Sequence, residues 1–132
     1  MKEFVSLLRA RPDVRLAVVY GSVARGEHHP GSDLDLLVSF ASEEAHTSAS
    51  LAVALTEETG RRVQVVSLST ARRAPLLLVD ILHEGRVLLD RDDEWSALKR
   101  QEREIQREAV AADADLDRRI AELAELVARP IS

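Results

Sequence analysis

The fold of this chain is decided by two neighbouring stretches, Val14-Arg-Leu-Ala-Val-Val-Tyr-Gly-Ser22 and, after ten intervening residues, Asp33-Leu-Asp-Leu-Leu-Val-Ser-Phe40. The apolar runs at residues 14–20 and 36–40 predict strands, and the first is apolar enough to be central and buried on both faces. The Gly-Ser pair between them predicts a tight turn that leads into a short helix over about residues 22–26. The predicted layout is therefore strand, turn, short helix, strand.

Asp33 and Asp35 are candidate metal ligands. Side chains at positions i and i+2 of a strand point to the same face, so these carboxylates are expected side by side at the start of the second strand. Such a pair repels itself, and aspartate is disfavoured in strands, so a compensating cation is needed. Mg²⁺ is typically held by one or two carboxylates together with substrate phosphates. A turn cap followed by a solvent-facing strand start is the alternative, and the spacing from the Gly-Ser pair favours metal binding.

Gly21, Ser22 and Arg25 are candidate phosphate-binding residues. Glycine lets the backbone approach a phosphate closely, and the start of a helix offers free N–H groups. Ser22 can also cap the short helix, which uses the same geometry. Arg25 is either a solvated residue or a triphosphate contact, and the fit of arginine to phosphate favours the contact. Beside Asp33 and Asp35, these residues indicate metal-assisted handling of a nucleoside triphosphate such as ATP.

The motifs Gly21-Ser-Val-Ala-Arg-Gly-Glu27 and Ser32-Asp-Leu-Asp-Leu-Leu-Val38 resemble the signature of the DNA-polymerase-β-like nucleotidyltransferase superfamily. The closest resemblance is to minimal nucleotidyltransferases that serve as antitoxins to HEPN-type toxins. The motif region covers about residues 14–40, and the similarity in layout extends to about residue 90. The spacing of Gly-Ser to Asp-x-Asp is far more specific than a lone glycine motif.

The resemblance implies a function and a partner. It implies transfer of a nucleoside monophosphate from ATP onto a protein, with a small helical HEPN-type toxin as the partner. Asp33 and Asp35 would hold Mg²⁺ and be catalytic, Gly21 and Ser22 would cradle the β- and γ-phosphates, and Arg25 would assist. A small-molecule nucleotidyltransferase is a weaker alternative, because those enzymes commonly carry an additional domain for the acceptor.

One position departs from the family pattern. The family normally carries a third carboxylate on a later strand, and the matching position is Gln64. An amide takes no proton at neutral pH and is a poor substitute for a carboxylate at a metal. Either the chain is a catalytically impaired antitoxin that acts by binding alone, or another residue or a partner supplies the base. Asp80 and Glu84 lie in an expected helix, and the role is assigned to neither.

Composition supports one small domain and excludes several classes. With 132 residues and 45% hydrophobic content, the chain has the usual size and core content of a single domain. It has no cysteine, no apolar run of membrane-span length and no signal-peptide pattern, so a cytoplasmic protein is expected. The net charge of -5 argues against sequence-independent binding of long nucleic acid.

The order of elements predicts an α/β (α+β) fold, with a nucleotidyltransferase-like mixed sheet and helices mainly on one face. Pro75 suits the first turn of a helix, and Gly60 and Gly85 suit helix ends. The strand at residues 86–90 is expected at an edge, and His28 and His29 are expected in a surface turn. The expected helices are residues 2–10, 42–60 and 75–84, the strands are 14–20, 36–40, 62–68 and 86–90, and the turn is 28–32.

The character of the chain changes at about residue 92, which predicts a nucleotidyltransferase-like domain over residues 1–91 and a helical extension over residues 92–132. A continuous helix over residues 92–128 would be about 55 Å long. It must therefore project, fold back or pack on another chain. A pair of helices broken near Ala114-Asp115 is the alternative. The apolar stripe of this segment fits packing on its own domain about as well as binding of a partner, and a homo-oligomer through this helix is a further alternative.

Overall fold

The computed structural model describes residues 1–27, 33–42 and 47–128. These residues include a mixed sheet in the order β3-β2-β1-β4. The central strand β1 is antiparallel to both of its neighbours, whereas β2 and β3 are parallel. The strands are β1 (Val14–Tyr20), β2 (Leu34–Phe40), β3 (Val63–Ser67) and β4 (Arg86–Asp90). The predicted fold class, the central position of β1 and the edge position of β4 are confirmed.

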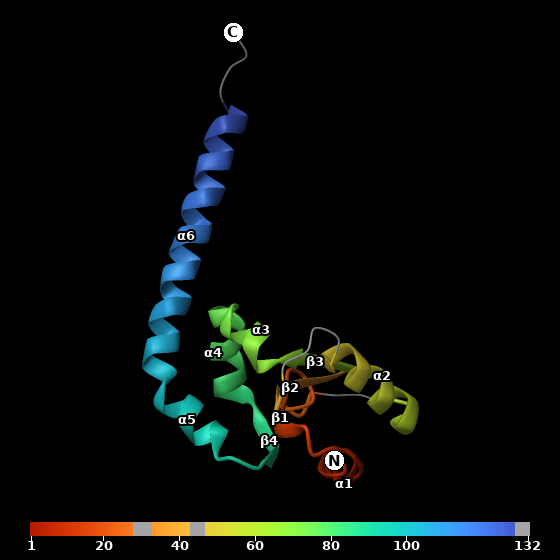
Figure 1. Cartoon of the computed structure of the whole chain (residues 1–132). Coiled ribbons are helices and arrows are strands. Elements are labelled where there is room, and N and C mark those ends of the chain that lie inside the picture. The colour runs from red at the N-terminus through yellow and green to blue at the C-terminus, as the bar shows by residue number, and fades with distance from the viewer. Residues whose placement is uncertain (28–32, 43–46, 129–132) are drawn as a thin grey trace.

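Helices cover both faces of the sheet, most of them on one face (Figure 1). Two contribute buried side chains to one core and four to the other, among the described residues. The first pair is α1 (Lys2–Arg9) and α2 (Thr47–Thr59); the other four are α3 (Leu68–Arg72), α4 (Pro75–Glu84), α5 (Glu94–Arg100) and α6 (Glu102–Ala128).

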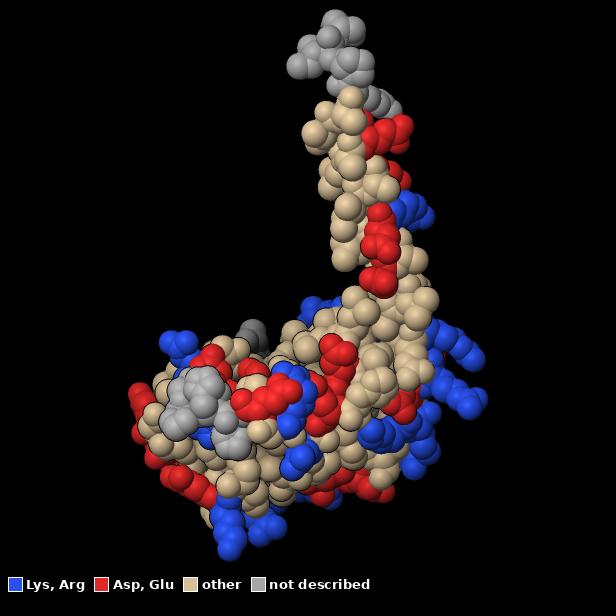
Figure 2. Space-filling model, turned by 180° about the vertical axis from the view of Figure 1, so that it is seen from behind, with Lys and Arg blue, Asp and Glu red and all other residues tan. Residues whose placement is uncertain are grey.

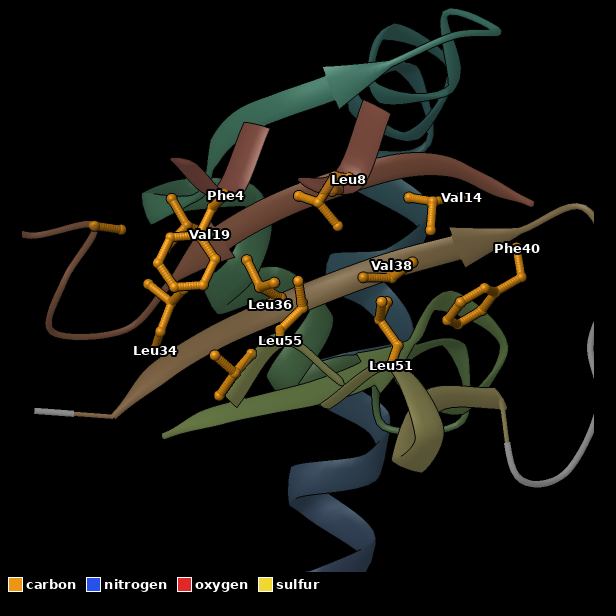
Figure 3. Close-up of a cluster of buried hydrophobic side chains, with 13 residues drawn as sticks. Phe4, Leu8, Val14, Val19, Leu34, Leu36, Val38, Phe40, Leu51 and Leu55 are labelled. Carbon is orange, nitrogen blue, oxygen red and sulfur yellow. The ribbon is translucent and has the colours of Figure 1, made fainter. Parts of the chain in front are cut away.

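On β2 the two cores divide the residues by parity, because successive side chains of a strand point to opposite faces. On β1 the irregularity between Val14 and Leu16 places these two even-numbered residues in different cores. The core under α1 and α2 contains Phe4 and Leu8 beside Val19, Leu36 and other side chains of even number on β2 (Figure 3). The core on the opposite face includes Leu16, Val18, Leu37, Leu78, Ile81, Leu82, Leu98 and Ile105. Both cores are built mainly from aliphatic residues, as a chain with 3% aromatic residues requires.

The predicted short helix at residues 22–26 is wrong, because this segment is a series of turns. Its hydrogen bonds mix spacings: the Arg25 N–H donates to Gly21 O, and the Glu27 N–H donates to Ser22 O. Gly21 and Gly26 have φ of 78° and 75°, outside the helical region. The segment between these glycines is a single turn, too short to sustain a helix.

Sequence patterns also missed helix α3. Its N-cap is Ser67, whose side-chain oxygen accepts a hydrogen bond from the Thr70 N–H at 3.1 Å. Ser67 and Thr70 are thus a capping signal at the end of a strand. The expected turn at residues 28–32, with His28 and His29, lies outside the described residues. So do Glu43 and Glu44 of the second helix, which the sequence predicts from Ser42; Ser42 is not helical, and α2 is described from Thr47.

The C-terminal segment forms two helices, so both expected forms, one continuous helix over residues 92–128 and a pair broken near Ala114-Asp115, are wrong. The break is at Gln101, where the N–H donates to Leu98 O with i→i−3 spacing. Leu98 of α5 and Ile105 of α6, at 1% and 5% exposure, lie in the same core. Helix α6 then packs on α4. The division of the chain at residue 91 stays a prediction.

The distal part of α6 projects away from the sheet (Figure 1). At about 1.5 Å per residue, its 27 residues make a helix of about 40 Å. Figure 2 shows a mostly uncharged strip along one side of the projecting end and charged atoms along the other. Large apolar side chains on this end are half exposed or more: Leu116, Ile120, Leu123, Leu126 and Val127. Within the described part of the chain, no helix is long and apolar enough to cross a membrane.

Candidate functional site

The sheet brings Asp33, Asp35 and Gln64 together. Asp33 directly precedes β2, Asp35 is its second residue, and Gln64 lies opposite Asp35 in the parallel register with β3. The Gln64 amide Nε2 donates a hydrogen bond to Asp33 Oδ2 at 3.1 Å. The position that the sequence pattern matched to a third carboxylate therefore lies beside both aspartates, and an amide occupies it.

The glycine turn passes directly beside Asp35. Gly21 follows the last residue of β1 and has a φ of 78°, a conformation that suits glycine far better than other residues. A Cβ on Gly21 would lie 2.8 Å from Asp35 Oδ2. Glycine is therefore favoured here by its φ, and a larger residue would displace the Asp35 carboxylate.

The charge around Asp35 favours a cation. Burial, and then the neighbouring charge of Asp33, raise the pKa of the Asp35 carboxyl above its ordinary value. Asp33 has the Gln64 amide and, at 4.0 Å, Arg62 Nη1 beside it. Among residues 1–27, 33–42 and 47–128, Asp35 has no ion-pair partner. A half-buried carboxylate with a like charge next to it is stabilised by a bound cation.

The carboxylates of Asp33 and Asp35 suit a Mg²⁺ ion whose other ligands come from a nucleotide and water. No cluster of three His, Cys, Asp or Glu side chains with metal-binding geometry occurs in the described part of the chain. Two carboxylates alone do not fill an octahedral coordination sphere, but Mg²⁺ commonly takes its remaining ligands from substrate phosphates and water. Asp33 and Asp35 therefore fit a metal that arrives with a nucleotide.

Glu84 joins the site from the far end of α4. Its Oε1 accepts a hydrogen bond from the Gly21 N–H at 3.1 Å, and its Oε2 pairs with Arg25 Nη1 at 2.8 Å. Arg25 Nε also pairs with Glu27 at 3.1 Å. Glu84, and then Glu27, raise the pKa of Arg25. Arg25 thus has two carboxylates as partners, and Ser22 lies in the same turn.

Tyr20 is a second residue that the sequence did not indicate. It ends β1 opposite Asp35. Burial, and then the charges of Asp35 and Glu84, raise the pKa of its hydroxyl. The Tyr20 hydroxyl therefore lies close enough to both carboxylates to interact with them electrostatically. The sequence contains only a partial signal for Glu84. Glu84 precedes Gly85, at the junction between α4 and β4, but no local pattern shows that β4 pairs with β1.

The family model for polymerase beta nucleotidyltransferases matches residues 2–94. The chain belongs to this nucleotidyltransferase family. The matched residues include the whole sheet and the sites of Gly21, Asp33, Asp35, Gln64 and Glu84. Among curated proteins, none matches the sequence significantly.

Solved structures with the same fold include antitoxin complexes. A toxin-antitoxin structure with AMP-PNP has a TM-score of 0.73 and 21% identity, with 93% of this chain and 97% of that chain covered. The MntA-HepT toxin-antitoxin has a TM-score of 0.67 and 18% identity, with 93% and 95% covered. The tri-AMPylated Shewanella oneidensis HEPN toxin in complex with MNT antitoxin has a TM-score of 0.61 and 23% identity, with 87% and 93% covered. At these identities the similarity establishes the nucleotidyltransferase fold.

Proposed function

We propose that this family member is an antitoxin-type nucleotidyltransferase that transfers a nucleoside monophosphate from ATP to a partner protein. One observation carries the proposal: Asp35 is half-buried, lies beside a second aspartate, has no ion-pair partner among the described residues, and lies against a glycine turn. A metal–triphosphate complex supplies the cation that this carboxylate pair lacks, and its phosphates are anions suited to the nearby Arg25 guanidinium.

The proposed roles follow from the contacts. Asp33 and Asp35 would hold Mg²⁺, which when bound neutralises charge on the triphosphate. Ser22 and the turn around Gly21 would bind the β- and γ-phosphates. Arg25 would contribute N–H groups that its two carboxylate partners leave open. An acceptor hydroxyl attacks the α-phosphorus: a new P–O bond forms, the bond to pyrophosphate breaks, and the hydroxyl proton is released.

The proposed acceptor is a HEPN-type toxin. Structures that share this fold include an antitoxin in complex with an AMPylated HEPN toxin. The projecting end of α6 offers an apolar surface for such a partner, since Leu116, Ile120 and Leu123 are 50–61% exposed. Self-association through the same helix competes with this proposal and would appear as a dimer of the isolated chain.

Calorimetry with ATP, with and without Mg²⁺, tests the proposal. The wild type is expected to bind ATP with Mg²⁺, and Asp33→Asn/Asp35→Asn is expected to lose that binding. The matched control is Asp113→Asn/Asp117→Asn, which removes the same charge from the exposed surface of α6. Absence of metal-dependent binding in the wild type would refute the transferase.

A second function, neutralisation of the toxin by binding alone, is favoured by the Gln64 amide at Asp33. This amide lies where a third carboxylate would face a metal. The two functions differ in one outcome. If binding alone suffices, Asp33→Asn/Asp35→Asn still protects cells that express the proposed HEPN-type toxin; if transfer is required, protection is lost.

A further inference from the structure

Glu84 links α4 to two residues of the glycine turn in the candidate nucleotide site, Gly21 and Arg25. These two residues are also joined to each other by a hydrogen bond from the Arg25 N–H to Gly21 O at 3.2 Å. Glu84 is the last residue of α4, and its side chain is 23% exposed. Each of its oxygens has its own partner, the Gly21 N–H for one and the Arg25 guanidinium for the other. Both partners belong to the turn between β1 and β2, so one carboxylate ties the two ends of this turn to α4.

The contact determines which donors of the turn remain for a phosphate. With Glu84 in place, the Gly21 N–H points towards α4 and is already used. Arg25 uses Nη1 for Glu84 and Nε for Glu27. Its Nη2 has no hydrogen bond within residues 1–27, 33–42 and 47–128. A guanidinium is planar, so fixing two of its nitrogens also fixes the direction of the third.

The same contact holds the turn against Asp35. Gly21 has its left-handed φ and lies so close to Asp35 that a Cβ would be 2.8 Å from the carboxylate oxygen. A flexible glycine does not stay in one conformation without external contacts, because it loses more backbone entropy on ordering than any other residue. The hydrogen bond from its N–H to Glu84 supplies such a contact.

We propose that Glu84 is a positioning residue of the nucleotide site: it holds Gly21 beside Asp35 and aims the remaining N–H groups of Arg25 at the triphosphate. This inference rests on the proposed function. The charge of Glu84 is compensated by Arg25 at 2.8 Å, so a bound triphosphate meets an ion pair and not a free carboxylate. Glu84 can therefore support the binding of a triphosphate although its own side chain is negatively charged.

The experiment is calorimetry of ATP binding with Mg²⁺ on the full chain. Glu84→Ala is expected to weaken binding about tenfold, the size of losing a charge-assisted hydrogen bond. Glu84→Gln keeps an oxygen for the Gly21 N–H but loses the charge, and is expected to lose less. The control is Asp80→Asn, an exposed carboxylate one turn earlier on α4, which is expected to bind as the wild type does.

A double-mutant cycle separates positioning from general destabilisation. If Glu84 acts through Arg25, Glu84→Ala weakens binding much less in the Arg25→Gln background than in the wild type. Independent, additive losses would overturn the proposal. Hydrogen exchange of the Gly21 amide without nucleotide gives a further readout: exchange is expected to be faster in Glu84→Ala, and unchanged exchange would overturn the contact itself.

The remaining outcomes are equally distinct. Tighter binding by Glu84→Ala would make Glu84 a competitor of the phosphate, and unchanged binding would make it irrelevant; either result overturns the inference and leaves the proposed function standing. A wild type that binds no ATP with Mg²⁺ overturns both.

Discussion

Replacing Gly21 with alanine separates the function of the glycine turn from its contribution to stability. Gly21 and Gly60 both have left-handed backbone conformations, with φ of 78° and 70°. An alanine in that region costs about 1–2 kcal/mol. They differ in their surroundings: a Cβ at Gly21 lies 2.8 Å from Asp35 Oδ2, whereas a Cβ at Gly60 meets nothing within 4 Å. Gly60→Ala is therefore a matched control for backbone strain.

The two variants are expected to lose similar stability. For a chain of this size, a loss of about 1–2 kcal/mol lowers the melting temperature by roughly 3–10 °C. The contact at Gly21 adds little to that loss, because the atom it meets is the end of a side chain. Asp35 instead has to rotate away, which separates it from the ligand position beside Asp33.

Calorimetry of ATP binding with Mg²⁺ and thermal denaturation are the assays. Gly60→Ala is expected to bind as the wild type does at a temperature where both are folded, and Gly21→Ala is expected to lose binding by about tenfold or more. If Gly21→Ala binds normally while its melting temperature falls, the closeness of the turn to Asp35 has no role in binding and the reasoning is refuted.

Three further predictions concern Asp35, Gln64 and α6. The pKa of Asp35 is raised above its ordinary value of 3.8, so the folded state binds this proton more tightly than the unfolded chain does. Ionised Asp35 therefore lowers the stability at pH values above the raised pKa. This loss of stability disappears as the pH falls from the raised pKa towards 3.8. Without metal, Asp35→Asn is expected to melt about 1–3 °C higher than the wild type at pH 7, a gain kept small by solvent screening, and a pH series of melting temperatures should show it shrinking in acid. Gln64→Asp is expected to raise Mg²⁺-dependent nucleotide transfer to the partner severalfold, as measured with labelled ATP, because a carboxylate replaces an amide opposite Asp35; equal or lower transfer would contradict this role for the position. A chain that ends at Ala114 keeps Ile105 and Ala109, the buried residues of α6, so its melting temperature is expected to fall by no more than about 2 °C. Its capture of the HEPN-type partner in a pull-down is expected to be lost, and normal capture would show that the distal helix is not the binding surface.

Local patterns were sufficient wherever one segment carried the whole signal. The apolar runs of β1 and β2 specify strands, and Pro75 and Gly85 mark the ends of α4. The prediction failed where several weak preferences compete. Residues 22–26 include the helix-favouring Ala24 and Arg25, but Gly21 and Gly26 have positive φ, so only one turn of chain lies between these two glycines. The break at Gln101, marked by the hydrogen bond from its N–H to Leu98 O, lies in a stretch whose local composition favours a continuous helix.

The same division applies to the candidate site. The sequence by itself determined that Asp33 and Asp35 share a short stretch after a glycine turn, because their spacing of two is a property of the strand alone. Only the tertiary structure decided that Gln64 lies opposite Asp35 and that Glu84 contacts Gly21 and Arg25. Those contacts join residues 29 to 63 positions apart along the chain, by way of the parallel register of β2 with β3 and the passage from α4 into β4 beside β1. Register and packing between distant segments minimise the free energy of the whole core, and no single segment contains that information.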